Sequence, residues 1–287
     1  MTLTLTPTPR IAVNGVSLYV RMTGRGEPLV LLHGFTGSSR SWLPHVAEFK
    51  SHHFCISVDL LGHGGSDVPL DPARYRMDKQ IDDLLDVFDA LGLGQVNLMG
   101  YSMGGRVALS FAIAHPERVR SLVIESASPG ITDPAERRER IRNDEVLAES
   151  IENEGLEKFV EHWERLPLFA TQNALPQALR DELRQQRLRN SPRGLINSLR
   201  GLGTGVQPPV WDKLGKLTMP VMLMVGEFDQ KYTSIALRMA AKIPKVKVAI
   251  IEGAGHTIHL EKPATFNRVL LHFLESVTAE QELRARG

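Results

Sequence analysis

Residues 96–105 read VNLMGYSMGG, and this stretch decides the fold. The first four residues form a short apolar run typical of a buried strand, and a helical pattern follows from about Gly104 to His115, with Pro116 just past its end. Between them lies Gly-Tyr-Ser-Met-Gly, a G-x-S-x-G turn whose glycines let strand and helix approach closely. We expect Ser102 to be a nucleophile; the alternative is a serine that only caps a helix in a binding module.

Other apolar runs alternate with helical patterns on both sides of this stretch. Strands are expected at residues 29–32, 54–60, 122–124, 221–225 and 248–251. These runs are too uniformly apolar for half-exposed strands, so we interpret them as buried. Helical spacing runs from Met77 to Leu91, and Gly92 is placed to end that helix. The pattern predicts an α/β fold with a mostly parallel sheet flanked by helices.

One long segment, residues 131–212, contains no convincing strand and consists of helical stretches with clustered charge. We interpret it as a helical cap inserted between two strands of a core formed by residues 1–130 and 213–287. A disordered loop is the alternative, but side chains such as Trp163 and Phe169 supply packing material that disordered segments lack.

A serine hydroxyl becomes a useful base or nucleophile only when a histidine accepts its proton and a third group orients that histidine. Asp229 comes directly after the strand expected at 221–225, and His256 follows the one at 248–251. Because carboxyl ends of parallel strands face a common crevice, both residues should meet Ser102 at one edge of the sheet. We therefore predict Ser102, Asp229 and His256 as the catalytic residues.

The loop His-Gly-Phe-Thr-Gly, residues 33–37, follows the first expected strand. A turn there can point the main-chain N–H of Phe35 at the same place as the N–H of Met103, and two such donors form an oxyanion hole. An ordinary glycine-rich loop is the alternative. A second glycine-rich turn, residues 59–66, matches neither a phosphate loop nor a dinucleotide fingerprint, so we expect a structural role for it.

Composition excludes several classes of protein. The 287 residues carry 34 Lys and Arg against 33 Asp and Glu, a formal net charge of +1, which argues against a nucleic-acid binder. The single cysteine, Cys55, excludes an internal disulfide framework. His259 lies three residues after His256, but no carboxylate or cysteine cluster completes a metal site there. We expect neither metal nor cofactor.

No apolar run approaches the roughly 20 residues that span a bilayer, and the first nine residues lack a signal-peptide pattern. These features favour a cytoplasmic protein without membrane insertion. The net charge also hides an uneven distribution, because residues 133–165 hold 11 acidic and 6 basic side chains, whereas residues 180–216 hold 3 acidic and 8 basic. A nearly neutral chain can therefore still enclose a small anion site beneath the cap.

Five motifs, in order HGFTG, DLLGHGGSD, GYSMGG, GEFD and GAGH, look like those of the α/β-hydrolase superfamily over nearly the whole chain. A narrower resemblance rests on Arg106 after the GYSMGG motif, ESASPGI at the start of the cap, Arg140 in ERIRND, Trp163 followed by PLF, Arg189 in LRN, and FDQKY. Together these resemble the 2-succinyl-6-hydroxy-2,4-cyclohexadiene-1-carboxylate synthases of menaquinone biosynthesis.

This resemblance implies a lyase that eliminates pyruvate from 2-succinyl-5-enolpyruvyl-6-hydroxy-3-cyclohexene-1-carboxylate. The Ser-His-Asp set would then remove a proton, and the oxyanion hole would hold an enolate. It also implies that the substrate pocket is formed by side chains of the cap and of the elbow, the G-x-S-x-G turn with the start of the helix that follows it. These side chains are Tyr101, Arg106, Arg140, Trp163 and Arg189. Arginine suits a polycarboxylate because its planar fork binds carboxylates in a bidentate way.

Two other classes of function stay open at this point. The same residues could serve a carboxylesterase or thioesterase acting on small acyl substrates, or the fold could form a receptor without activity. A cap arginine in a charge-rich helix is otherwise most often a solvated side chain. The expected partner is a small anionic polycarboxylate substrate, with no nucleic acid, and the chain is expected to act as a monomer or small homo-oligomer.

Overall fold

The computed structural model describes residues 10–286, so the segment examined for a signal peptide lies outside the described residues. Its centre is an eight-stranded sheet in the order β1-β2-β4-β3-β5-β6-β7-β8. The strands are β1 (Arg10–Val13), β2 (Val16–Gly24), β3 (Glu27–Leu32), β4 (His53–Val58), β5 (Val96–Tyr101), β6 (Val119–Glu125), β7 (Val221–Gly226) and β8 (Val246–Ile251). Strands β3 to β8 pair in parallel, and the predicted α/β class is confirmed.

Two features of the sheet differ from the prediction. Strands β1 and β2 form an antiparallel hairpin that the search for continuous apolar runs did not find, because β2 alternates buried and half-buried residues. Strand β8 was expected to be fully buried, but it is the edge strand and Ile250 is 49% exposed. An edge strand packs against one neighbour only, so its apolar residues stay partly open to solvent.

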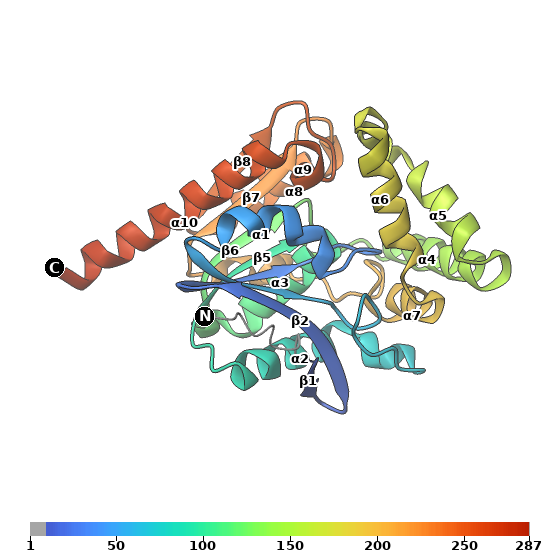
Figure 1. Cartoon of the computed structure of the whole chain (residues 1–287), viewed down its shortest axis with the longest axis horizontal. Coiled ribbons are helices and arrows are strands. Elements are labelled where there is room, and N and C mark those ends of the chain that lie inside the picture. Colours follow the sequence, from blue (N-terminus) through green and yellow to red (C-terminus); the bar gives the residue numbers. More distant parts are fainter. Residues whose placement is uncertain (1–9, 287) are drawn as a thin grey trace, which may run out of the picture.

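Helices cover both faces of the sheet (Figure 1), and alternate strand residues contribute to two apolar cores. On one face, Leu29 and Leu31 pack with α1 (Leu43–Phe49) and α10 (Pro263–Arg286). On the other face, Val30 and Leu32 share a core with α2 (Met77–Ala90), α3 (Met103–Ala114) and α8 (Gln230–Ala240). Helices α2 and α3 agree with the two helices predicted from the sequence.

The chain between β6 and β7 is a helical insertion, as predicted. It contains α4 (Pro134–Glu154), α5 (Leu156–Glu164), α6 (Gln177–Leu188) and α7 (Pro192–Leu202). In Figure 1 these helices gather beside one end of the sheet, away from the end of α10. They have a core of their own, which includes Ile151, Phe159, Leu195 and Leu199. The cap boundaries at residues 131 and 212 stay a prediction.

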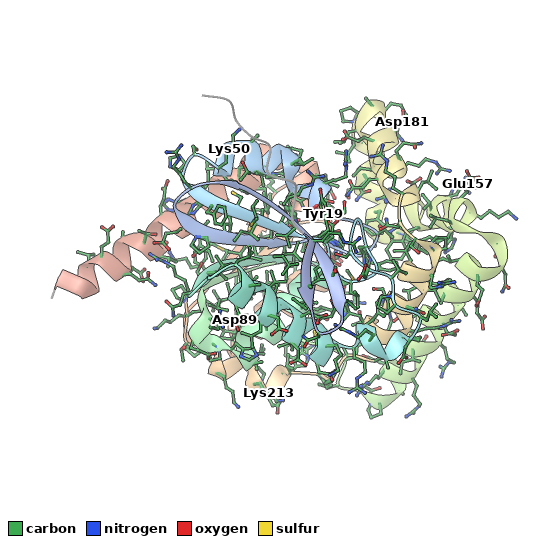
Figure 2. The ribbon with its side chains drawn as sticks, turned by 60° about the horizontal axis from the view of Figure 1, so that its bottom comes forward. Tyr19, Lys50, Asp89, Glu157, Asp181 and Lys213 are labelled. Atoms are coloured by element: carbon green, nitrogen blue, oxygen red, sulfur yellow. The ribbon has the colours of Figure 1, made fainter. Side chains whose placement is uncertain are left out.

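Short helical segments complete the described chain. They are α9 (Ile258–Glu261) and the 3-10 segments η1 (Ser39–Trp42), η2 (Pro72–Tyr75), η3 (Pro116–Arg118), η4 (Pro167–Ala174) and η5 (Trp211–Lys216). Figure 2 shows Glu157 of α5 and Asp181 of α6 on the outer side of the insertion, so acidic groups of these helices face away from the sheet. Across residues 10–286, no helix is both long enough and apolar enough to span a membrane.

Candidate active site

Ser102 stands on a sharp turn between β5 and α3. Its φ of 49° lies in the left-handed region, a strained conformation for a residue with a side chain. The turn is held because the Ser102 N–H donates to the carbonyl of Glu125 at 2.8 Å. A Cβ on Gly100 would lie 2.3 Å from the carbonyl oxygen of Gly104, and one on Gly104 would lie 2.4 Å from that of Leu32. Glycine at both positions is therefore what lets strand and helix meet here.

The predicted serine, histidine and aspartate come together at the carboxyl edge of the sheet. His256 Nε2 lies 3.2 Å from Ser102 Oγ, and His256 Nδ1 lies 2.6 Å from Asp229 Oδ2. A carboxylate only accepts hydrogen bonds, so Nδ1–H donates to Asp229 and leaves Nε2 to accept from the serine hydroxyl. His256 is 1% exposed and Asp229 7% exposed, so little water competes for these bonds. The arrangement can move the Ser102 proton to His256.

The two predicted oxyanion-hole residues, Phe35 and Met103, line the same pocket as Ser102. Within residues 10–286, neither main-chain N–H donates to a main-chain carbonyl. The loop that carries Phe35 is fastened to the elbow, because the Gly104 N–H donates to the carbonyl of His33 at 3.1 Å. This contact joins the two donor segments beside the serine, as an oxyanion hole requires.

Arg106 lies one turn along α3 and lines the Ser102 pocket. It is 9% exposed, and its guanidinium donates to the Leu202 carbonyl at 2.7 Å and to Gln207 Oε1 at 2.9 Å. Burial lowers the pKa of Arg106 to about 10, and the positive charge of Arg140 acts in the same direction. A buried cation with only neutral acceptors is a ready partner for a carboxylate.

Arg140 of α4 lines the same pocket from the cap, where its Nε donates to Asp144 Oδ1 at 2.8 Å. Burial raises the pKa of Asp144, and the neighbouring Arg140 opposes this shift. Tyr232 of α8 also lines the pocket, and its burial raises the pKa of its phenol. Arg106 and Arg140 thus both line the pocket of Ser102, and of the two only Arg140 is paired with Asp144.

The predicted aromatic residues form two walls of this pocket. Trp163 lines it and packs edge-on against Phe35, with ring centroids 5.3 Å apart, and against Phe169 at 5.4 Å. The Tyr101 hydroxyl lies 2.8 Å from Thr257 Oγ1, and burial raises the pKa of Tyr101 well above its ordinary value. Trp163 therefore contributes to packing within the cap and to the pocket surface.

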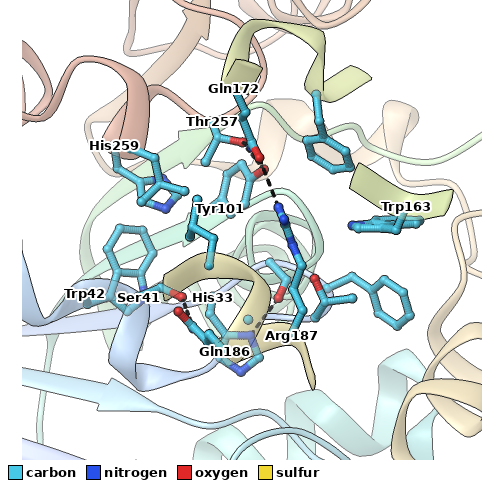
Figure 3. Close-up of a pocket in the computed structure, with 17 residues that line it drawn as sticks. His33, Ser41, Trp42, Tyr101, Trp163, Gln172, Gln186, Arg187, Thr257 and His259 are labelled. Atoms are coloured by element: carbon cyan, nitrogen blue, oxygen red, sulfur yellow. Dashed lines mark hydrogen bonds between the residues drawn. The ribbon is translucent and has the colours of Figure 1, made fainter. Parts of the chain in front are cut away.

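Arg189 is the predicted site residue that the structure does not bring to Ser102. It is exposed and borders a separate cavity together with Arg21 and Arg40. The reason is helical geometry, since side chains two positions apart on a helix point to nearly opposite faces. Arg187 takes the inward face instead, and Figure 3 shows it pointing into a pocket beside Tyr101 and Trp163.

Arg187 is a functional candidate that sequence reasoning missed. It is 8% exposed, its Nη1 bonds Glu164 Oε1 at 2.8 Å, and its Nη2 donates to Gln172 Oε1 at 3.0 Å. Leu183 and Arg187 lie four residues apart and are both buried on one face of α6, but the sequence alone does not show which face of this helix is buried.

The pocket at Arg187 adjoins the Ser102 pocket. The two share four lining residues, Phe35, Tyr101, Trp163 and Phe169. Together they form a site with an assembled Ser-His-Asp set, three buried or half-buried arginines and aromatic walls. Among the described residues, no group of three or more histidine, cysteine, aspartate or glutamate side chains could hold a metal ion.

Comparisons with known proteins show the family and the fold of the chain. A family model for the alpha/beta hydrolase fold matches residues 27–263. A Bacillus subtilis (strain 168) protein, provisionally named 2-succinyl-6-hydroxy-2,4-cyclohexadiene-1-carboxylate synthase, is 45% identical over 88% of this chain and 91% of its own length. The synthase of that name from Enterobacter sp. (strain 638) is 32% identical over 88% of this chain and 95% of its own. The solved structure of MenH from S. aureus matches with a TM-score of 0.87 and 36% identity, covering 91% of this chain and 98% of that one.

Proposed function

The chain belongs to the alpha/beta hydrolase fold family and, within it, to the 2-succinyl-6-hydroxy-2,4-cyclohexadiene-1-carboxylate synthases, and we propose on this basis that it eliminates pyruvate from 2-succinyl-5-enolpyruvyl-6-hydroxy-3-cyclohexene-1-carboxylate. It is an enzyme, a carbon–oxygen lyase of menaquinone biosynthesis on a hydrolase scaffold. The observation that most supports a lyase acting on a carboxylate substrate is Arg106, a buried cation that lines the same pocket as Ser102.

The reaction begins with the ring proton next to the succinyl ketone. His256 accepts the proton of Ser102, and the serine oxygen removes the ring proton. The electron pair moves onto the ketone oxygen, and the resulting enolate accepts hydrogen bonds from the main-chain N–H groups of Phe35 and Met103. Asp229 holds His256 in the tautomer that this transfer needs.

The second half of the reaction breaks the carbon–oxygen bond to the enolpyruvyl group. As the ketone re-forms, the electron pair shifts through the ring double bond and expels the enolate of pyruvate. That enolate takes up one proton and becomes pyruvate, while the ring, which began with one double bond, ends with two conjugated double bonds. The proton removed at the start thus balances the proton gained by the leaving group.

The arginines suit the carboxylates of this substrate. Arg106 and Arg140 border the serine, and Arg187 borders the adjoining pocket, so separate carboxylates of one molecule can meet separate cations. We include Tyr101 and Trp163 as walls for the ring, and we replace Arg189 by Arg187 in the substrate-binding set. The proposed binding partner is therefore a small polycarboxylate. We also propose that the protein acts in the cytoplasm.

The direct experiment is a pyruvate-coupled assay with purified protein and the enolpyruvyl substrate. We expect pyruvate release that Ser102→Ala abolishes. A carboxylesterase or thioesterase is the second candidate, favoured by the hydrogen bonds that join Ser102, His256 and Asp229. It predicts burst kinetics with an activated ester and no pyruvate release. Weak turnover of an activated ester alone does not decide, since the same three residues support it as a side reaction.

A further inference from the structure

A second carboxylate and histidine, Glu125 and His259, meet beside the Arg187 pocket, which His259 lines, and the reaction above uses neither. Glu125 is the last residue of β6 and is 0% exposed. Both of its carboxylate oxygens accept from the Nδ1–H of His259, at 3.0 and 2.9 Å, and one also accepts from the His259 main-chain N–H at 3.1 Å. His259 is 2% exposed and lies between aromatic rings, with centroids 4.7 Å from Trp42 and 4.8 Å from Tyr101.

Glu125 contacts Ser102 directly and the segment just after His256 through His259, each with different atoms. Its main-chain carbonyl accepts the N–H of Ser102 at 2.8 Å, which fixes the elbow. Its side chain holds His259, which lies three residues after His256, in the first turn of the helix α9 that follows the histidine loop. One residue therefore joins the strand edge that carries the serine to the loop that carries the histidine.

The other supports of this loop do not make the same connection. Glu261 accepts from the N–H groups of Gly255 and Thr257, at 2.6 and 3.1 Å, but all three residues belong to the loop and α9. Tyr101 reaches Thr257 through one hydroxyl contact of 2.8 Å. The carboxylate of Glu125 is thus the charged contact between β6 and the histidine loop.

A buried ion pair is weak evidence for stability, because removing two charges from water costs about as much as their attraction returns. The positioning of the catalytic groups explains the buried Glu125–His259 pair better than stability does. Reacting groups must be held to within about 0.5 Å, and a misplacement of roughly 1 Å lowers rates about 100-fold.

We propose that Glu125 and His259 are positioning residues, which tie the histidine loop to β6 and so hold His256 Nε2 within reach of Ser102 Oγ. His259 also lines the Arg187 pocket, whereas Glu125 lines neither that pocket nor the Ser102 pocket. The proposed effect of both residues passes through His256, and the separation of kcat from KM distinguishes it from substrate contact. The proposal rests on the proposed function only for the choice of substrate, because the Ser102–His256 contact can also be probed with a reagent that needs no substrate.

The deciding variant is the double substitution Glu125→Gln with His259→Gln, accompanied by Glu125→Gln alone. The double variant keeps similar volumes and hydrogen-bonding amides while it removes the carboxylate and the imidazole, so folding is preserved best. The matched control is Asp83→Asn. Asp83 lies on α2 and is 1% exposed. Arg74 donates to its two carboxylate oxygens at 2.6 and 2.8 Å. That change breaks a buried ion pair outside the active site.

Three quantities are measured for each variant: kcat and KM for pyruvate release, the rate of Ser102 labelling by a fluorophosphonate, and the thermal unfolding midpoint. We expect the double variant to lose about tenfold to 100-fold in kcat and in labelling rate, with KM within about twofold. Asp83→Asn should lower the unfolding midpoint and leave kcat and labelling within about twofold.

The proposal is overturned if the double variant keeps kcat and labelling rate within about twofold of wild type, or if Asp83→Asn lowers both as much. A change confined to KM also overturns it, since that would indicate substrate contact. If wild type releases no pyruvate, the proposed function fails, whereas the labelling comparison still decides the role of Glu125 and His259.

Discussion

The guanidinium of Arg106 donates to Oε1 of Gln207 at 2.9 Å, a bond that links helix α3 of the core to the segment that follows α7. Its other acceptor is the carbonyl of Leu202, and it forms no ion pair with a carboxylate inside residues 10–286. The protein therefore keeps one buried positive charge beside Ser102 without a negative partner of its own. Under the proposed function, a substrate carboxylate supplies that partner.

Replacing this charge tests the substrate class. Arg106→Gln should lower kcat/KM for the polycarboxylate substrate by about 30-fold or more, because truncating one partner of a buried charge pair costs roughly 2 kcal/mol or more. Turnover of a neutral activated ester should change by less than about threefold, since that ester has no carboxylate to lose. Steady-state kinetics with both substrates check this. An equal loss with both would mean that Arg106 supports the fold and not the anion.

The protonation of Arg106 predicts how KM for the polycarboxylate substrate depends on pH. Burial places the pKa of Arg106 at about 10, below its ordinary 12.5. The protonated form binds a carboxylate, so KM should stay level at neutral and mildly alkaline pH and rise as the pH passes about 10. Initial rates measured up to pH 10.5 should show this rise in wild type. KM of Arg106→Gln should not follow it, and a parallel rise in that variant would assign the effect to another group.

Arg187 in the last turn of α6 and Arg189 just after its end form a matched pair. Arg187→Gln removes a charge from the pocket wall and should raise KM for the polycarboxylate by about tenfold or more. Arg189→Gln changes an exposed side chain beside another cavity and should leave kcat and KM within about twofold. Michaelis constants of the two variants, measured side by side, decide between the positions. The reverse order of effects would restore the original assignment of Arg189.

The tight turn at Ser102 predicts that a single added methyl group, at Gly104, lowers both stability and activity. In Gly104→Ala the new Cβ would lie 2.4 Å from the Leu32 carbonyl oxygen and 2.6 Å from that of His33, so main chain must move beside the oxyanion donors. We expect a lower unfolding midpoint and at least a roughly tenfold loss in kcat. Gly94→Ala is the control, because nothing lies within 4 Å of its added Cβ. Full activity in Gly104→Ala would show that the turn tolerates such a shift.

The parts of the fold that could be predicted are those with uniform local patterns. The apolar run of β5, the glycines around Ser102 and the strand-end positions of Asp229 and His256 carry their information in a few neighbouring residues. Strand β2 was not predicted because its residues alternate between buried and half-buried positions. Ile250 of β8 was misjudged because a run of apolar letters does not show whether a strand lies at an edge.

The cap was harder to predict because its site residues depend on helix rotation. Arg187 and Arg189 differ by two positions, and only the packing of α6 decides which one faces inward. The link between Glu125 and His259 was also hidden, since 134 residues separate them and the ESASPGI stretch that contains Glu125 gives no sign of a histidine partner. Long-range contacts of this kind follow from the sheet order, which the sequence pattern alone does not supply.

The central claim is that Ser102 acts as the base in a pyruvate elimination. The most direct measurement follows pyruvate and the conjugated cyclohexadiene together, in wild type and in Ser102→Ala, with 2-succinyl-5-enolpyruvyl-6-hydroxy-3-cyclohexene-1-carboxylate as substrate. We predict equal amounts of both products from wild type and a loss of at least about 10³-fold in Ser102→Ala. Folded wild-type protein that labels at Ser102 with a fluorophosphonate yet releases no pyruvate would contradict the claim.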